Sequence, residues 1–196
     1  FRDVSVEAIG RVYDDLDVSF DVWLGESSVH DRIGPMVERL ESSGVAVPSD
    51  GAIVVNVSDD DEDHQLPPLM LVKSDGGYAY ATTDLATVEE RVEDLDGTGA
   101  IYVVDARQSL HFEQVFRAAR KGGIAPESFV LEHAKIGTVN GLDGTPLRTR
   151  DGDLPLLRDL LADIESIAIA SMEAKGLAAD YPDSERAEIA WLVGMA

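Results

Sequence analysis

The sequence predicts an α/β fold in which strands alternate with helices. The strongest evidence is a strand, a helix and a second strand in succession between residues 100 and 131. Residues 100–104 form a continuous apolar, β-branched run between turn-forming residues, which is typical of a parallel strand buried on both faces. A helix with one apolar side follows and ends at two glycines, and a further apolar run occupies residues 129–131. This order implies a right-handed parallel crossover.

The N-terminal part of the chain predicts two helices and one strand. Apolar residues at helical spacing predict an amphipathic helix over residues 1–16: Ile9, Val12, Tyr13 and Leu16. Residues 18–24 alternate between apolar and polar, as a half-buried strand does. A turn at residues 25–27 then leads to a second helix that begins near Asp31.

Two apolar runs, residues 51–57 and 69–73, predict the strands of an antiparallel hairpin. Between them lie five consecutive acids at residues 59–63, for which two interpretations exist. Metal binding is one, and a solvated hairpin loop is the other. Like charges in a run repel and stay hydrated, and no glycine bends this run into a calcium loop. We therefore predict a solvated loop. The four His are scattered and Cys is absent, so the sequence predicts no metal site.

The C-terminal part predicts two further helices. Residues 154–175 carry a broad apolar stripe and are followed by Gly176, which is typical of a helix end. Another helix begins near Asp183 and continues to Ala196. Because the sequence stops inside an apolar stretch, we expect it to be a piece of a longer protein.

Composition restricts the classes of function. Acidic residues outnumber basic ones by 38 to 16, which gives a net charge of −22. Such a chain repels nucleic acid at low salt, which argues against a free-standing RNA-binding module. The acidity is typical of proteins from salt-loving organisms, in which screening makes high surface charge tolerable. No apolar run is long enough to span a bilayer, and the absence of Cys fits a reducing cytoplasm.

The most informative stretch is residues 74–86. A turn at residues 75–77 precedes a short strand at residues 78–81, and three residues able to cap a helix follow at 82–84. A carboxylate at such a strand-to-helix corner lies where α/β proteins bind ligands. Taken alone, Asp84 or Thr87 is best interpreted as a helix N-cap, since residues 87–90 form a capping box.

The same stretch closely resembles the Asp-Gly-Gly-x-x-Tyr-x-Thr-x-Asp-Leu-Ala run of class I arginyl-tRNA synthetases. In that family the run lies at the arginine pocket, which implies that Asp84 accepts hydrogen bonds from the guanidinium and that Tyr80 adds a polar contact. A carboxylate matches the planar fork of guanidinium donors. The family's Phe-Asp-x-x-x-Gly-Glu-Ser element is also present and implies that Glu26 lies in this pocket. The alternative for Glu26 is an exposed turn carboxylate.

A second resemblance lies at residues 105–112, which match the family's Arg-Gln-x-x-His-Phe form at a strand-to-helix turn. It implies that Gln108 binds the amino-acid end of the substrate and that His111 belongs to the site, on the ATP side. An amide both donates and accepts, which suits an ammonium beside a carboxylate. The alternative is that Gln108 and His111 only cap or brace the helix.

A third resemblance covers residues 131–152 and implies the ATP site. His133, Gly137 and Val139 match the family's His-x-x-Phe-Gly-x-Val pattern. The following Asp-Gly-x-x-x-Lys-Thr-Arg-x-Gly pattern implies that Arg148 and Arg150 offset charge on the ATP phosphates. The sequence departs from the pattern by four residues: Ile136 for Phe, Leu142 and Thr145 where Lys is common, and Arg148 for Lys. The alternative is an exposed Gly-rich hairpin at residues 140–152.

Together the resemblances imply a Rossmann-like parallel sheet with helices on both faces and an inserted antiparallel hairpin near residues 51–73. Residues 1–196 would be part of a catalytic domain, without the N-terminal tRNA-binding and C-terminal anticodon-binding domains. The family's His-Ile-Gly-His-like motif would precede Phe1, so we expect this chain alone to be inactive.

The implied function is that of an arginine–tRNA ligase, which activates L-arginine with ATP and transfers it to tRNA(Arg). Mg²⁺ would accompany ATP, and no tightly bound cofactor is expected. We expect a cytoplasmic monomer that contacts tRNA(Arg) mainly through other domains and has no membrane contact. The alternative is a non-catalytic, synthetase-like domain for arginine binding or protein interaction.

Overall fold

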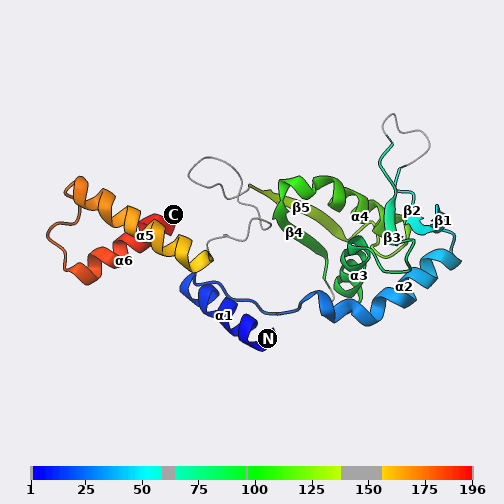
Figure 1. Ribbon diagram of the computed structural model, residues 1–196, viewed down its shortest axis with the longest axis horizontal. Helices are drawn as coiled ribbons and strands as arrows, with labels where there is room; N and C mark the ends of the chain where they lie inside the picture. Colours follow the sequence, from blue (N-terminus) through cyan, green and yellow to red (C-terminus); the bar gives the residue numbers. More distant parts are fainter. Residues whose placement is uncertain (1, 59–64, 96, 138–155, 196) are drawn as a thin grey trace. The chain divides into compact units, whose positions relative to one another are not determined.

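The computed structural model describes residues 2–58, 65–95, 97–137 and 156–195 (Figure 1). The chain divides into two compact units. We call Val22–Val139 the central unit, and Phe1–Asp21 with Asn140–Ala196 the terminal unit. The central unit is mixed α/β, whereas the described elements of the terminal unit are helices.

The central unit holds all the described strands and the helices that cover them. In chain order its elements are η1 Glu26–Val29, α2 His30–Ser42, β1 Ala46–Ser49, β2 Ala52–Val55, β3 Leu69–Val72, α3 Tyr80–Glu93, β4 Gly99–Asp105, η2 Ala106–Gln108, α4 Ser109–Lys121 and β5 Val130–Ile136. Their apolar faces share one core, which includes Met36, Leu71, Leu85 and Val115.

β1, β2 and β3 form an antiparallel sheet in that order. The predicted pairing of the two runs that became β2 and β3 is confirmed, while β1 was not predicted. β1 and β2 join through Asp50 and Gly51, which both have positive φ, 48° and 80°. An Asp-Gly pair of this kind is a strong hairpin signal, and it could have revealed β1. The acidic run at residues 59–63 lies outside the described residues.

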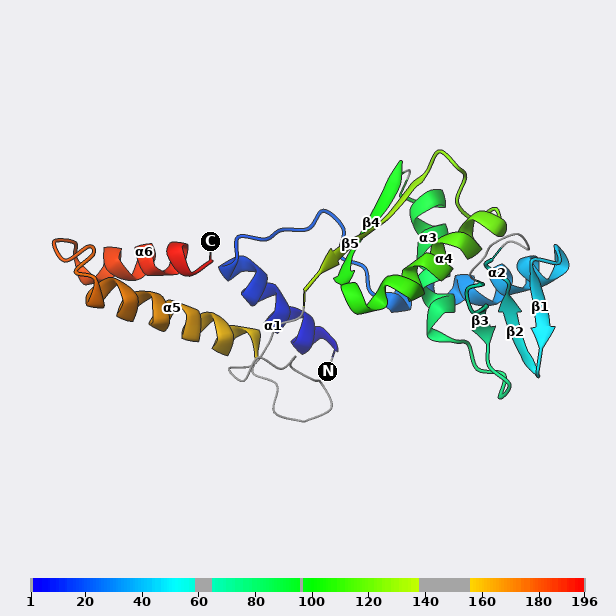
Figure 2. The same ribbon diagram turned by 90° about the horizontal axis from the view of Figure 1, so that it is seen from above.

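β4 and β5 pair in parallel, with Ala100 opposite Leu131 and Val104 opposite Lys135, so the predicted parallel pairing is confirmed. α3 and α4 pack together against one face of this pair (Figures 1 and 2). On the other face, Ile101 and Val103 are 63% and 64% exposed. The prediction that residues 100–104 are buried on both faces is therefore wrong for the described chain. An apolar run indicates that both faces of a strand can be buried, but it does not show that the described residues of this chain pack on both faces.

Two predicted strands are absent from the described residues. Residues 18–24 take no strand conformation, and their apolar side chains are about half exposed: Val18, Phe20, Val22, Trp23 and Leu24. Alternation fits a half-buried strand, but a strand also needs a neighbour to pair with. Residues 78–81 give only one bridge, between Tyr78 and Val72, because α3 already begins at Tyr80.

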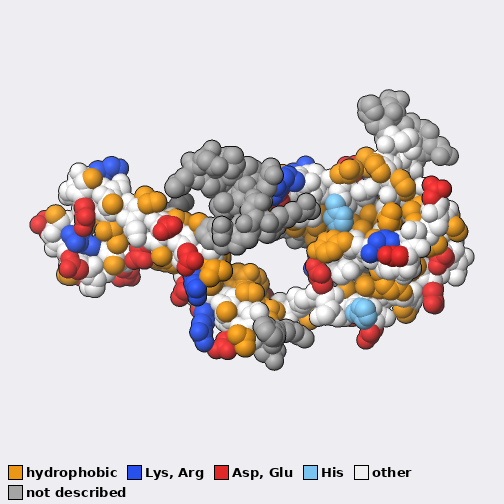
Figure 3. All heavy atoms as spheres, viewed as in Figure 1, with side chains coloured by type: hydrophobic (Ala, Val, Ile, Leu, Met, Phe, Trp, Pro, Cys, Tyr) orange, Lys and Arg blue, Asp and Glu red, His pale blue; other side chains and the backbone are white. Residues whose placement is uncertain are grey.

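The terminal unit contains α1 Arg2–Asp15, α5 Leu157–Ala174 and α6 Asp183–Met195, which confirms the three helices predicted there. α5 and α6 lie side by side as a helical hairpin around Ala168, Met172 and Ala190 (Figure 1). On the face seen in Figure 3, acidic side chains are spread over both units rather than gathered in one patch. None of the described helices is both long and apolar enough to cross a membrane.

Candidate functional site

The entrance to α3 is fixed by a tight turn after β3. Gly76 has a φ of 83°, a conformation that favours glycine, and Asp75 Oδ1 accepts a hydrogen bond from the Gly77 amide at 2.9 Å. The Thr82 hydroxyl, fully buried, donates to the carbonyl of Leu71 on β3 at 2.6 Å. These contacts tie the first turn of α3 to the antiparallel sheet.

This turn places Asp84 inside the helix rather than at its start. The N-cap position of α3 is Ala79, so the interpretation of Asp84 or Thr87 as the cap is wrong. The Thr87 hydroxyl instead donates to the Thr83 carbonyl at 2.7 Å. The capping box was misleading because the N-cap of the helix lies eight residues before Thr87, at a turn set by β3. Asp84 is therefore free to serve another purpose.

Asp84 lines a cavity of about 560 Å³ in the central unit. The four residues implied for arginine binding all line this cavity: Glu26 on η1, Tyr80 and Asp84 on α3, and Gln108 at the end of η2. They come from three segments separated by more than 20 residues each. The structure thus brings together residues whose proximity the spacing alone does not predict.

Glu26 and Tyr80 form a direct pair at the cavity. The Tyr80 hydroxyl donates to Glu26 Oε1 at 2.7 Å. This hydrogen bond to the carboxylate, with a smaller contribution from burial, raises the pKa of Tyr80 to about 12. Since its proton is committed to Glu26, the Tyr80 oxygen offers only lone pairs to any further partner.

Asp84 also contacts a histidine on the neighbouring helix α4. His111 Nε2 lies 2.7 Å from Asp84 Oδ2, and the two side chains are 25% and 21% exposed. Gln108 is the N-cap residue of α4, but its side chain makes no capping hydrogen bond. The Gln108 side chain therefore does not cap α4, whereas the contact between His111 and Asp84 braces α4 against α3.

Comparison with known proteins decides the family. Residues 1–196, the whole chain, match the family described as tRNA synthetases class I (R), catalytic domain. The chain belongs to the arginyl-tRNA synthetase family. It is 48% identical over its full length to the arginine–tRNA ligase of Maricaulis maris, and 46% identical over 83% of its length to that of Agathobacter rectalis. It spans about a third of these relatives, 33% and 27%.

Solved arginyl-tRNA synthetases share the fold. The Plasmodium falciparum enzyme superposes with a TM-score of 0.75 at 22% identity, covering 98% of this chain and 31% of that one. The Thermus thermophilus enzyme gives a TM-score of 0.62 at 21% identity, covering 83% of this chain and 32% of that one. The chain is thus a catalytic-domain region of the arginyl-tRNA synthetase family.

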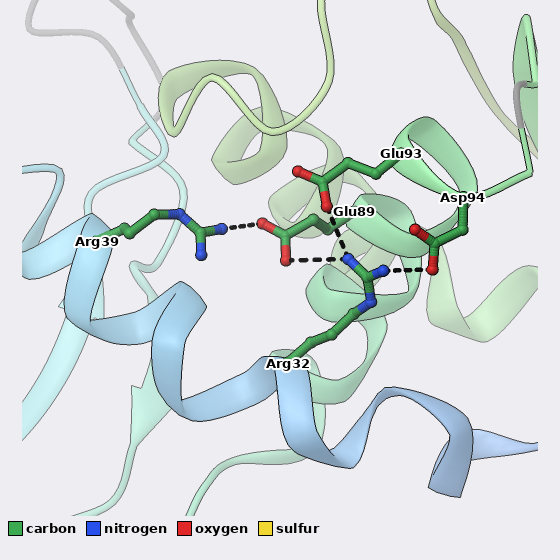
Figure 4. A network of polar contacts seen from close by, with 5 residues as sticks. All are labelled: Arg32, Arg39, Glu89, Glu93 and Asp94. Atoms are coloured by element: carbon green, nitrogen blue, oxygen red, sulfur yellow. Dashed lines mark hydrogen bonds and ion pairs between the residues drawn. The ribbon is translucent and has the colours of Figure 1, made fainter.

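In this synthetase domain an ion-pair network holds α3 against α2 (Figure 4). Arg39 pairs with Glu89, whose side chain is only 6% exposed. Arg32 pairs with Asp94, with Glu93 at 2.8 Å and with Glu89 at 3.8 Å. Burial raises the pKa of Glu89, although Arg39 and Arg32 act in the opposite direction. The network fixes the helix that carries Tyr80 and Asp84.

Five further residues of α3 and β4 line the cavity and were not assigned to it by the sequence analysis: Thr87, Glu90, Arg91, Tyr102 and Val104. Thr87 and Arg91 continue the helix face of Tyr80 and Asp84, so i, i+4, i+7, i+11 spacing could have identified them. The Arg91 guanidinium carbon lies 5.1 Å from the centre of the Tyr102 ring, a cation–π distance. Burial is the main cause that raises the pKa of Tyr102. This end of the cavity is partly apolar, since Leu95 and Phe112 also line it.

The residues implied for ATP are only partly described in this synthetase domain. His133 Nε2 lies 3.0 Å from the Val104 carbonyl, and its Nδ1 is buried with no hydrogen-bond partner in the part of the chain that the structure describes. Gly137 follows β5 and leaves open space beside it. Val139, Arg148 and Arg150 lie outside the described residues, as does the loop at 140–152.

The described residues contain no group of three or more His, Asp or Glu that could hold a metal ion. The site's own chemistry is that of hydrogen-bond acceptors around the cavity.

Proposed function

We propose that the cavity binds the guanidinium of L-arginine through Glu26, Tyr80 and Asp84, and the amino-acid end through Gln108. The observation that carries the proposal is the direction of two hydrogen bonds. Tyr80 points its proton at Glu26, and His111 contacts one oxygen of Asp84. The remaining lone pairs of Tyr80, Glu26 and Asp84 are all acceptors.

A guanidinium matches this set of hydrogen-bond acceptors in the cavity. It has five N–H donors in a planar fork, no acceptor and a permanent positive charge. Glu26, Asp84 and Glu90 each contribute a carboxylate, and Arg91 is the one cationic side chain that lines the described cavity. The ammonium of lysine is a compact point charge, so it matches the several separate hydrogen-bond acceptors of the cavity less well than the planar guanidinium does. The cavity thus favours arginine over other cationic amino acids.

In the full-length protein we propose the two-step reaction of class I synthetases. The arginine carboxylate attacks the α-phosphorus of ATP, which forms arginyl-adenylate and releases pyrophosphate. The arginyl group then passes to the 3′ end of tRNA(Arg), and AMP leaves. Arg148 and Arg150 would offset charge on the phosphates, and His133, Gly137 and Val139 would contact ATP. Mg²⁺ bound with ATP would neutralise further phosphate charge.

We further propose that tRNA(Arg) is held mainly outside this chain, because a net charge of −22 repels a phosphate backbone. The protein would act as a monomer in the cytoplasm.

The proposal is tested with arginine and citrulline, which has a neutral urea in place of the guanidinium. The full-length protein should bind arginine at least about a hundredfold more tightly, because citrulline loses the charge-assisted bonds and faces carboxylates with an oxygen. It should also catalyse arginine-dependent pyrophosphate exchange when tRNA(Arg) is present. Equal affinity for the two ligands would contradict the pocket. Tight arginine binding without exchange would favour the non-catalytic alternative.

A further inference from the structure

We propose that His111 is a positioning residue for arginine recognition: it orients Asp84 while neutral, and it weakens arginine binding when it becomes protonated. This inference rests on the proposed arginine site and adds a pH response to it. His111 acts through Asp84, since Asp84 lines the cavity and His111 does not.

The geometry defines what His111 does. His111 lies in the first turn of α4. The centre of its ring is 5.2 Å from that of Phe112, which is edge-on to it, and 6.3 Å from that of Tyr80. The only described side-chain hydrogen bond to Asp84 is the one from His111 Nε2 at 2.7 Å. Because Asp84 is not the N-cap of α3, its carboxylate does not bond to the first backbone amides of the helix, and no other described hydrogen bond fixes its rotamer.

Only one tautomer of the neutral ring suits this contact. The proton must sit on Nε2, so that the ring donates to Asp84 Oδ2. The carboxylate then keeps its full charge and holds Oδ1 free for the guanidinium. A second proton on the ring places a positive charge 2.7 Å from the carboxylate. That charge competes with the guanidinium for Asp84 and also repels it.

The neighbouring groups leave few other sources of pH dependence near neutrality. The titratable and charged groups that the structure places around this ring and the cavity beside it are Asp84, Tyr80, Glu90 and Arg91 on α3, Glu26 on η1, Tyr102 on β4 and His133 on β5. The raised pKa values of Tyr80 and Tyr102 keep both phenols neutral there. Imidazole is the side-chain type whose charge can change between about pH 5 and 8.

The experiment measures the arginine Kd of the full-length protein by calorimetry across that pH range, for the wild type and three variants. His111→Gln retains an N–H donor for Asp84 but cannot titrate. His111→Leu removes the donor. His30→Gln is the histidine control: His30 is exposed at the start of α2, directly after η1, and it is not among the residues that line the cavity.

The wild type and His30→Gln should lose arginine affinity as the pH falls through the imidazole range. At neutral pH His111→Leu should weaken arginine binding about tenfold, the size expected for a hydrogen bond to a charged group. His111→Gln should bind nearly as tightly as the wild type, without its pH dependence. In pyrophosphate exchange, His111→Leu should raise the KM for arginine and leave the KM for ATP unchanged. If His111 instead contacted ATP directly, the substitution would raise the KM for ATP.

Two results would overturn this inference without affecting the proposed function. One is a folded His111→Leu variant that binds arginine as tightly as the wild type does. The other is a His111→Gln variant whose pH profile matches that of the wild type. If His111→Leu does not fold, as judged by circular dichroism, the His111→Gln profile still decides. A wild-type protein that does not bind arginine at all would overturn the proposed function as well. These failures are therefore distinguishable.

Discussion

Replacing Arg39 with methionine should loosen the contact between α2 and α3. The Arg39 guanidinium pairs with Glu89, a carboxylate whose side chain is 6% exposed (Figure 4). Methionine keeps most of the aliphatic volume but removes the charge. Glu89 would then depend on Arg32, which is 3.8 Å away and is shared with Glu93 and Asp94.

The expected loss lies between two limits. Removing one partner of a fully buried pair costs about 3–5 kcal/mol, whereas exposed pairs contribute about 0.2–1 kcal/mol. Here Glu89 is buried, but the Arg39 side chain is 56% exposed and Arg32 remains as a partial substitute. We therefore expect Arg39→Met to lower the free energy of unfolding by about 1–2 kcal/mol.

Urea denaturation of the wild type, Arg39→Met, Glu89→Met and the double variant measures this effect as a double-mutant cycle. Amide hydrogen exchange in α3 locates the loss. The double variant should be more stable than the sum of the single changes predicts, because it leaves no unpaired buried charge. A change below about 0.5 kcal/mol for Arg39→Met, or additive single effects, would refute this account of the network.

Three further predictions concern salt and pH. The melting temperature should rise from low to molar salt, because screening to a Debye length of about 3 Å relieves the self-repulsion of a chain with net charge −22; a flat or falling curve contradicts this. Burial raises the pKa of Glu89, so the native state binds its proton at higher pH than the unfolded state. The contribution of Glu89 to the unfolding free energy should therefore fall as pH rises through that window, and Glu89→Gln should remove that contribution. The raised pKa of Tyr80, from 10.0 to about 12, predicts a tyrosinate titration near that value which Tyr80→Phe removes; stability should fall as pH rises between these values, and an unchanged titration in the variant would show that the hydrogen bond to Glu26 is not formed.

The sequence predicted most helices well because each has an apolar face of its own. α2, α4, α5 and α6 lie where periodicity places them, and the parallel pairing of β4 with β5 followed from the crossover rule. Strands were harder, since a strand depends on its neighbours. Residues 18–24 alternate between apolar and polar as a strand does, but they have no strand partner among the described residues. β1 was missed because the Asp-Gly turn that joins it to β2 was not used as a hairpin signal.

The site shows a similar division. Motif resemblance named Glu26, Tyr80, Asp84 and Gln108, and all four line one cavity, while their roles remain proposals. Local rules failed at Asp84, because the start of α3 is set by contacts with β3 that no capping pattern encodes. The contact between His111 and Asp84 could not be predicted either, since it depends on how α3 and α4 pack.

The central claim is that Asp84 recognises the guanidinium of arginine, and Asp84→Asn tests it most directly. Asparagine keeps the size of the side chain, removes its charge and faces the guanidinium with donors of its own. Breaking a charge-assisted pair in a desolvated pocket costs about 3–5 kcal/mol, or two to three or more orders of magnitude in Kd at about 1.4 kcal/mol per decade. We predict that loss of arginine affinity in a full-length variant whose melting temperature stays close to that of the wild type. Unchanged arginine affinity in the folded variant would contradict the assignment of this cavity to arginine.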